Sequence, residues 1–415
     1  MIAAEPRSFQ IPLIEFVESD DLYLQQQEDV LWFSVLRDLD WRSFRPVAAR
    51  YYEALWQFNV RQAQIVYAEL RDNPSFSRAC GFTLPRPGHY SYTDIPSLRK
   101  LQQFDQIMTE AGLWSEAKID QVRRNLQADR IHVEPTLVHD TTHYPAYSSM
   151  RTVEVPPPAP PAVAAENADD GAGTVVKSAG KMYWAHKAST LCFPGQEVLL
   201  DAVAMSDAAS HDSQSLVPHL NRLFQAYPEL KPAVQRVLDD GAADDATLKE
   251  TVQADLGIEL CAPINPRGRK PIRDELPRGM DHITPRGTPV CRAGYPFDFV
   301  GCRHDTQRFV FRAPEDAQGV PVCQGCRLRP ECYRGADGAR QITVPFERLP
   351  WIDPKFPQLS RRFARVMAHR TAIERLHKLM KYDYGDEQLT KRGNAAFQAR
   401  LDKTVLAMHV LLAQS

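Results

Sequence analysis

The chain has 415 residues, of which 43% are hydrophobic and 25% charged, and its formal net charge is −2. These values exclude a largely disordered chain, and the length predicts two or three folding units. The sequence contains no apolar run long enough for a membrane span, and its first residues include acids where a signal peptide has a basic head and an apolar core. We therefore expect a cytoplasmic protein without membrane contact.

Positive charge is concentrated near the C-terminus. The near-neutral total means that nucleic-acid binding would depend on local patches rather than on the whole surface. From Arg361 onward there are eleven Lys and Arg against five Asp and Glu, and Arg361, Arg362 and Arg365 fall within five positions. This run predicts either a helix face that contacts DNA or an ordinary solvated face.

The first part of the chain has helical periodicity. Apolar residues recur at three- and four-residue spacing in segments 30–41, 49–70 and 97–114. Prolines and a turn-rich stretch around Gly88 separate the second block from the third. We expect an all-α N-terminal region over residues 1–126.

The pattern then changes to extended runs at 130–140, 181–193, 197–206 and 233–240. Between the first two runs, residues 155–180 are rich first in Pro and Ala and then in Gly and Asp. Such a segment has too few large apolar side chains to pack. It is predicted to be a mobile linker inserted between neighbouring strands.

Helical and extended segments alternate after the third extended run. Residues 211–227 predict an amphipathic helix that Asp212 would cap, and residues 244–257 predict a second helix, capped by Asp245. A short buried strand is expected at 258–264. This alternation predicts an α/β fold built on a sheet.

Residues 263–350 are rich in Pro, Gly, Arg and Cys and show little periodicity, with short strands expected only at 309–313 and 341–346. We interpret this segment as an inserted, loop-rich module. Beyond it, a long helix over 361–384 and a further helix over 395–413 are predicted from their apolar spacing.

Five of the eight cysteines lie in this module. In a reducing compartment such crowding indicates metal binding rather than disulfides. Cys323, Cys326 and Cys332 form a C-x2-C-x5-C run, and the spacing of the first pair suits two thiolates on one tetrahedral zinc ion. A zinc site would need a fourth ligand. The alternative is a set of buried free thiols.

Three acidic residues occupy positions that suit chemistry. Asp140 and Asp239 each close an extended run, and Gly241 allows a sharp turn after the second. Glu374 lies on the predicted long helix, with Arg370 one turn before it and Lys381 about two turns after it. Taken singly, the aspartates could be turn or capping residues and the glutamate part of a surface ion pair.

Taken together, these residues resemble the DDE transposases of bacterial insertion sequences. Arg370, Glu374 and Lys381 match the R-x3-E-x6-K signature of one large group in that family. Four further motifs match in chain order: VHDTTHYPAY around Asp140, WAHKASTLCF, HDSQSL, and VLDDGAADD around Asp239. The resemblance covers roughly residues 74–408.

Two positions depart from the family pattern. Met367 and Ala242 stand where the family often has tyrosine, before the arginine of the signature and after the second-acid glycine. The second departure leaves Asp240 as an alternative to Asp239, although the family spacing to Gly241 favours Asp239.

The resemblance implies a ribonuclease-H-like α/β fold, in which a mixed sheet with flanking helices brings the three acids together. The fold would be preceded by the all-α region and interrupted by the Cys-rich insertion. Asp140, Asp239 and Glu374 would be the catalytic residues and would hold two Mg²⁺ ions, or Mn²⁺. DNA phosphates would be bound by a set of cationic side chains, which are Arg370, Lys381, Arg361, Arg362 and Arg365.

The implied function is metal-dependent cleavage of double-stranded DNA at element ends and strand transfer into target DNA by a homodimer on paired ends. The alternatives are a catalytically inactive DNA-binding protein and a nuclease without strand transfer. The expected regions are 1–126, which would bind DNA ends, 127–262 and 351–415, which together form the catalytic domain, and the insertion 263–350.

The resemblance also suggests a fourth zinc ligand. Cys291 belongs to a segment, CRAGYPF followed by CQGC, that is similar to a cysteine-bearing insertion in some of these transposases. The predicted structural zinc site is therefore Cys291, Cys323, Cys326 and Cys332, with Cys302 or His304 as alternatives to Cys291.

Overall fold

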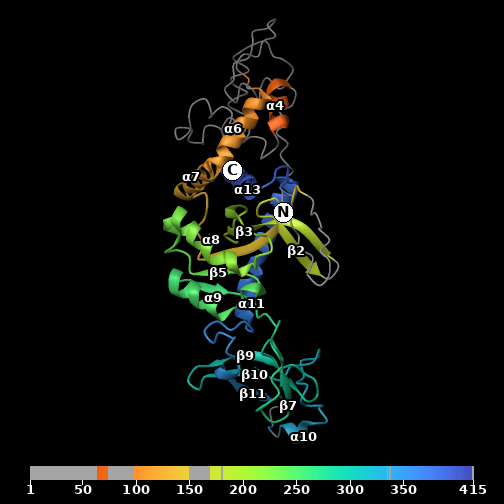
Figure 1. The fold of residues 1–415 in the computed structure, drawn as a ribbon. Coiled ribbons are helices and arrows are strands. Elements are labelled where there is room, and N and C mark those ends of the chain that lie inside the picture. Colours follow the sequence, from red (N-terminus) through yellow and green to blue (C-terminus); the bar gives the residue numbers. More distant parts are fainter. Residues whose placement is uncertain are drawn as a thin grey trace, which may run out of the picture. The chain divides into compact units, whose positions relative to one another are not determined.

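A computed structural model describes residues 63–72, 95, 97–148, 169–178, 181–333, 335 and 338–413. The chain forms two compact units, which we describe separately (Figure 1). Unit 1 comprises Met1–Val234 and Thr371–Ser415, and unit 2 comprises Gln235–Arg370. Both strands and helices contribute, so the expectation of a mixed α/β fold is confirmed.

The helices at the start of unit 1 follow the predicted apolar spacing. They are α4 (Ala63–Asp72), α6 (Leu98–Glu110) and α7 (Leu113–Gln127). The hydroxyl of Ser97 caps α6 by accepting a hydrogen bond from Lys100 N. The helix predicted over 30–41 lies outside the described residues.

The strands of unit 1 pair in an antiparallel manner around β3. These strands are β1 (Thr136–Pro145), β2 (Gly173–Ser178), β3 (Lys181–Cys192) and β4 (Leu199–Ala204). Strand β3 pairs with each of the other three. Strand β2 lies within the predicted linker, so that prediction is wrong for residues 173–178, whereas 155–168 lie outside the described residues. Val175 and Val176 favour an extended backbone there.

Helices cover both faces of β1. On one face, His139 contacts Ser215 of α8 (Ser213–Ala226) and Thr141 bonds to Asp212 just before that helix. On the other, Tyr144 contacts Met380 of the π-helical turn η7 (Leu379–Asp383), and α12 (Thr371–Lys378) packs against the strand. Helix α13 (Asn394–Leu412) packs against α7 and β4. Within the described residues, no helix combines the length and the apolar character needed to cross a membrane.

A buried ion cluster ties α7 to the sheet of unit 1. Lys118 on α7 is fully buried and contacts the carboxylate of Asp201 on β4 and, at 2.7 Å, that of Asp402 on α13. Arg222 on α8 also reaches Asp201, at 3.1 Å. Burial alone would lower the pKa of Lys118, but the two carboxylates outweigh it and raise that pKa. Helix α7 is therefore an integral part of unit 1.

Unit 2 begins with a short parallel pair, β5 (Arg236–Leu238) and β6 (Glu259–Cys261). Between them lie the 3-10 turn η3 (Gly241–Ala243) and helix α9 (Ala246–Thr251), which Asp245 caps as predicted. Unit 2 ends with α11 (Arg361–Met367) and the 3-10 turn η6 (Ala368–Arg370).

The long helix predicted over 361–384 is divided into four segments: α11, η6, α12 and η7. The apolar spacing is helical throughout, but the 3-10 and π turns alter the helical pitch locally. A single continuous α-helix was therefore the wrong prediction for this segment.

Residues 263–350, the expected Cys-rich insertion, contain more strands than predicted. Strands β10 (Arg308–Arg312) and β11 (Gln341–Pro345) confirm the two expected runs, and β9 (Asp298–Arg303) joins them in a three-stranded sheet (Figure 1). Strands β7 (Met280–Ile283) and β8 (Pro289–Cys291) form a separate pair. The apolar core of this insertion includes Phe297, Phe309, Phe311, Ile342, Val344 and Leu349.

Candidate functional site

Asp140 lies in the middle of β1 rather than at a strand end. The strand runs on to Pro145 because the β-branched Thr141 and Thr142 and the aromatic Tyr144 favour an extended backbone. Asp140 is half-buried and pairs in register with Thr190 of β3. Its carboxylate accepts a hydrogen bond from Thr141 N at 2.9 Å.

Glu374 lies on α12, a helix that is bonded to the strands at the position of Asp140. The Thr190 hydroxyl donates to the backbone oxygen of Asp140 at 2.9 Å, and its oxygen lies 2.7 Å from Nε2 of His377 on α12. His377 is three residues after Glu374, which is exposed in the first turn of α12. The predicted first and third acids therefore belong to elements that pack against each other.

Lys381 lies against the same face of β1 as Asp140. Its Nζ lies 5.0 Å from the ring centroid of Tyr144, a cation–π contact, and Tyr144 is four residues along β1 from Asp140. The sequence predicted Arg370, Glu374 and Lys381 on nearly one helical face, which assumed a continuous α-helix. Arg370 instead ends the 3-10 turn η6 and Lys381 lies in the π turn η7.

The opposite face of β1 carries a buried polar series that sequence reasoning did not identify. Nε2 of His139 lies 2.8 Å from Oγ of Ser189, and that oxygen lies 2.7 Å from Nδ1 of His219. Nε2 of His219 is 3.4 Å from Asp201 Oδ2. Burial lowers the pKa of His219. Because all four side chains are buried, this Ser, His and Asp arrangement is structural rather than nucleophilic.

Asp212 begins α8 but does not cap it with its side chain, contrary to the prediction. Its carboxylate instead accepts from the Thr141 hydroxyl at 2.8 Å and from Lys187 Nζ at 2.9 Å. Burial by itself raises the pKa of Asp212, but the hydrogen bonds from Lys187 and Thr141 outweigh it and lower that pKa. Thr141, the residue next to Asp140, is thereby fixed to the start of α8.

Asp239 follows β5 directly in unit 2 and is buried. Its backbone N–H bonds to the oxygen of Cys261 at 3.0 Å, and its carboxylate accepts from the backbone N–H of Asp240 at 2.7 Å. The Asp240 carboxylate caps η3 by accepting from Ala242 N at 2.7 Å. The two neighbours therefore differ, because Asp240 has a capping role within the turn.

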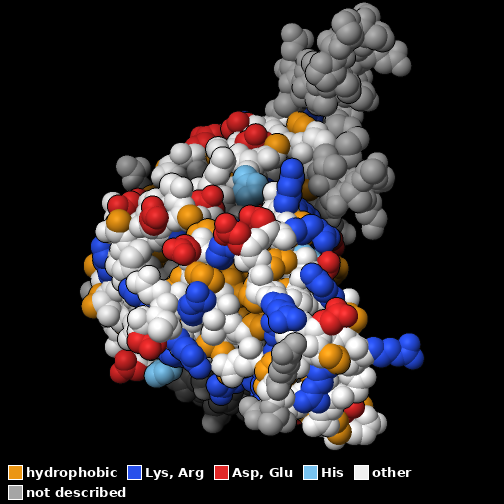
Figure 2. Space-filling view, turned by 90° about the horizontal axis from the view of Figure 1, so that it is seen from below, with side chains coloured by type: hydrophobic (Ala, Val, Ile, Leu, Met, Phe, Trp, Pro, Cys, Tyr) orange, Lys and Arg blue, Asp and Glu red, His pale blue; other side chains and the backbone are white. Residues whose placement is uncertain are grey.

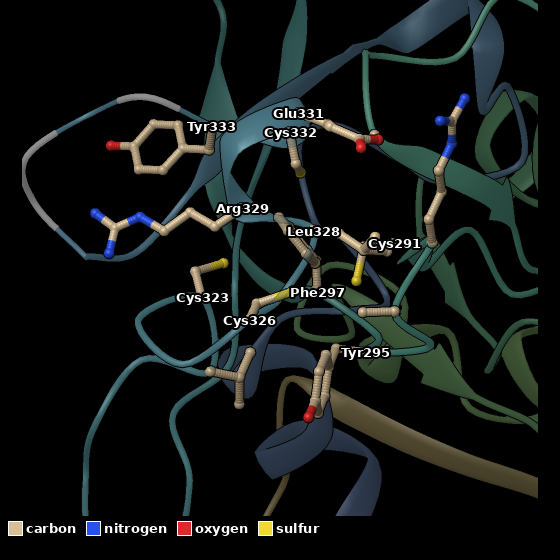
Figure 3. A pocket seen from close by; sticks show the side chains of 14 residues that line it. Cys291, Tyr295, Phe297, Cys323, Cys326, Leu328, Arg329, Glu331, Cys332 and Tyr333 are labelled. Atoms are coloured by element: carbon tan, nitrogen blue, oxygen red, sulfur yellow. The ribbon is translucent and has the colours of Figure 1, made fainter.

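The four predicted zinc ligands line one pocket of unit 2. Cys291 comes from β8, Cys323 and Cys326 from the loop before α10 (Arg329–Cys332), and Cys332 from that helix (Figure 3). Nη1 of Arg340 donates to Cys332 Sγ. The described cysteines form no disulfide.

The two alternative zinc ligands are not among the pocket-lining residues. Cys302 packs against the apolar core of the insertion, and burial raises its pKa. The His304 ring lies 5.9 Å from that of Phe346.

No group of three or more His, Cys, Asp or Glu side chains is already arranged around a metal position in the described part of the chain. The candidate ligands of Mg²⁺ and of zinc are therefore proposed from the secondary-structure elements that carry them and from the oxygen and sulfur atoms that they offer.

Three of the four predicted DNA-binding arginines lie on α11. Arg361, Arg362 and Arg365 are exposed, and the guanidinium of Arg362 lies 5.4 Å from the ring centroid of Phe356. Ser360 caps this helix by accepting from Phe363 N. Figure 2 shows Lys and Arg side chains spread among apolar ones on the face that it displays.

No family model and no curated protein matches this chain. Among solved structures, it is similar to a pre-cleavage Mos1 transpososome, with 10% identity, a TM-score of 0.19, and coverage of 51% of this chain and 58% of the Mos1 chain. A Mos1 mariner paired-end complex with Mn shares 12% identity at a TM-score of 0.19, with coverage of 51% of this chain and 57% of the Mos1 chain. A piggyBac transposase synaptic complex with hairpin DNA shares 9% identity at a TM-score of 0.36, with coverage of 94% of this chain and 75% of the piggyBac chain.

The matched region thus spans less than two thirds of the length of the Mos1 chains. All three TM-scores are below 0.5.

Proposed function

We propose that the chain is a transposase that cleaves DNA at the ends of a mobile element and joins the freed ends to target DNA. Asp140, Asp239 and Glu374 would be its catalytic acids. The observation that carries the proposal is the docking of α12, which bears Glu374, onto the strand that bears Asp140, through Thr190 and His377.

The donor atoms of these acids suit a hard divalent cation, because Mg²⁺ prefers carboxylate and water oxygens, and Mn²⁺ can substitute. Asp140 is half-buried and Glu374 is exposed, so water and substrate can reach both. Asp239 belongs to unit 2. Its buried carboxylate would be the third oxygen ligand of the set.

In this proposal Asp140 would be a ligand of both ions, Asp239 of one and Glu374 of the other. When bound, the ions would supply a nucleophilic oxygen at neutral pH and stabilise charge on the leaving oxygen. Water attacks the phosphorus at the element end, the P–O3′ bond breaks, and a 3′-hydroxyl is released. That hydroxyl then attacks a target phosphate and displaces a 3′-oxygen of the target strand.

Cationic side chains would hold the DNA for these steps. Lys381, on the Asp140 face of β1, and Arg370 would bind phosphate oxygens near the acids, since both carry a permanent charge at neutral pH. The exposed Arg361, Arg362 and Arg365 would bind the backbone farther along the duplex. A homodimer would hold two element ends.

We further propose that Cys291, Cys323, Cys326 and Cys332 hold a structural zinc ion. Four thiol groups around one pocket match the donor number and type of a closed tetrahedral site. The Arg340 guanidinium at Cys332 would stabilise negative charge on that sulfur.

The test is an assay of cleavage and joining on DNA that carries the element ends, with Mg²⁺ or Mn²⁺. We expect Asp140→Ala, Asp239→Ala and Glu374→Ala each to lose activity by about a thousandfold or more. Asp240→Ala is the matched control, because Asp240 caps η3, and it should retain most of the activity.

Two results would contradict the proposal. A wild-type protein that binds the ends but is inactive with both metals would be a DNA-binding protein without catalysis. A protein that cleaves but never joins would be a nuclease.

A further inference from the structure

A short basic loop, Asn265–Lys270, follows β6 in unit 2 and has a defined conformation. The Asn265 side chain accepts a hydrogen bond from Arg267 N at 3.0 Å, and Arg269 N donates to the oxygen of Pro266 at 3.3 Å. Gly268 has a φ of +78°, a backbone conformation that favours glycine. The loop therefore turns sharply at Gly268.

The buried carboxylate of Asp244 anchors the loop. The side chain of Asp244 is 1% exposed and accepts from Asn265 N at 2.9 Å, from Arg269 Nη2 at 2.9 Å and from Lys249 Nζ at 2.6 Å. The guanidinium of Arg269 also lies 5.1 Å from the ring centroid of Trp351. These contacts fix both ends of the loop, so its conformation does not depend on a ligand.

This anchor places the loop beside the turn that follows the second acid. Asp244 ends the turn that begins directly after Asp239 and Asp240. A methyl group added at Gly241 would lie 3.6 Å from the oxygen of Pro263 and 3.9 Å from Cβ of Asn265. The start of the loop therefore lies next to the second-acid turn, to which Asn265 N is bonded through Asp244.

The cationic residues of the loop divide into two kinds. Arg269 is paired with the buried Asp244. Arg267 and Lys270 are exposed, and neither forms an ion pair with any described residue. One cation thus holds the loop and two project from it, which is an arrangement suited to binding an extended polyanion.

We infer that Asn265–Lys270 is a phosphate-binding loop whose Arg267 and Lys270 contact the DNA backbone beside Asp239. The inference rests on the proposed function for its ligand, since the polyanion next to a cleaving acid is the DNA strand itself. Contacts of this kind position the strand without reading its sequence.

The test measures binding of a mixed-sequence 30-base-pair duplex without divalent metal over a range of salt concentrations. The double variant Arg267→Gln, Lys270→Gln should bind the duplex roughly tenfold more weakly at low salt. The negative slope of log Kobs against log salt should become less steep by about two. A matched control, Arg303→Gln with Arg312→Gln, removes two exposed arginines from β9 and β10 of the same unit. It should lose much less affinity.

Three outcomes would overturn the inference: no binding of the duplex by the wild type, an unchanged salt slope in the loop variant, or an equal loss in the control. Thermal melting of both variants checks that folding is intact, since all four side chains are exposed. If the wild-type protein binds DNA through the loop but does not cleave it, the transposase activity is refuted and the inferred phosphate contacts remain supported.

Discussion

The two units of this protein are stabilised in different ways. Unit 1 packs long, largely buried elements such as β3 and α13 and adds a buried ion cluster around Lys118. The insertion of unit 2 has short strands, a small aromatic core and four cysteines around one pocket. Small cores of this kind often need a metal to complete them. The candidate acids nevertheless come from both units.

Positive and negative charges are also distributed unevenly along the sequence. The whole chain has 50 Lys and Arg against 52 Asp and Glu, whereas residues 263–370 have 20 against 11. The near-neutral total therefore conceals a basic segment within unit 2. This difference supports the proposal that unit 2 supplies many of the cationic side chains that would bind DNA.

The largest expected effect concerns the cysteines of unit 2. Cys326→Ser should abolish stoichiometric zinc, and chelation of the wild-type protein should remove a binding free energy on the order of 10 kcal/mol. Zinc content by mass spectrometry and thermal melting check both. Cys302→Ser is the control and should retain zinc, because Cys302 does not line the pocket. Wild-type protein without zinc would refute this part of the account.

The next effect concerns the ion cluster of unit 1. Lys118→Met leaves Asp201 and Asp402 without their shared cation and should lower the free energy of unfolding by about 3–5 kcal/mol. Arg124→Met breaks a partly exposed pair with Asp120 and should cost less than about 1 kcal/mol. Urea denaturation at pH 7 measures both. Equal losses would show that the buried cluster does not stabilise unit 1.

Two buried groups of unit 1 should respond to pH in opposite directions. Burial raises the pKa of Asp386 to about 6, against the hydrogen bonds of Arg400 and Thr404. The folded state thus binds the proton more tightly, and stability rises as pH falls from 6 to 4. Burial lowers the pKa of His409 to about 4, so its contribution is present above pH 6.5 and is lost as pH falls toward 4.

Each contribution is about 3 kcal/mol, so the two nearly cancel in the wild type. Asp386→Asn should therefore make unfolding more sensitive to acid between pH 6.5 and 4 than it is in the wild type. His409→Gln should shift the dependence the other way. Urea denaturation at several pH values checks this pair, and parallel curves for both variants and the wild type would contradict it.

Elements with strong periodicity could be predicted from the sequence. The strands at Lys181–Cys192 and Leu199–Ala204 and the helices at Ser213–Ala226 and Asn394–Leu412 follow apolar spacing closely. Strands β7, β8 and β9 did not give such a signal, because they are short and interrupted by glycine or proline neighbours. The division of the long helix by 3-10 and π turns also leaves its apolar spacing intact.

The candidate acids could be identified by motif, but their supporting contacts could not. Thr190 and His377 are 187 positions apart in the chain, and Asp244 and Arg269 are 25 apart. Neither pair has a local sequence signature, since each is made by tertiary folding. The strand around Asp140 was placed too short for a related reason, because the polar Thr141 and Thr142 concealed its continuation.

The central claim is that the carboxylates of Asp140, Asp239 and Glu374 bind the divalent metal ions of the proposed reaction. The most direct measurement replaces Mg²⁺ with Fe²⁺ in the presence of ascorbate and peroxide, so that radicals formed at the bound iron cut the nearby polypeptide, and identifies the fragments by mass spectrometry. We expect cuts near all three acids, suppressed by excess Mg²⁺ and lost together in Asp140→Ala, because Asp140 is the proposed ligand of both ions. Cuts that are missing near one of the three acids in the wild type, or that persist at full strength in Asp140→Ala, would contradict the account.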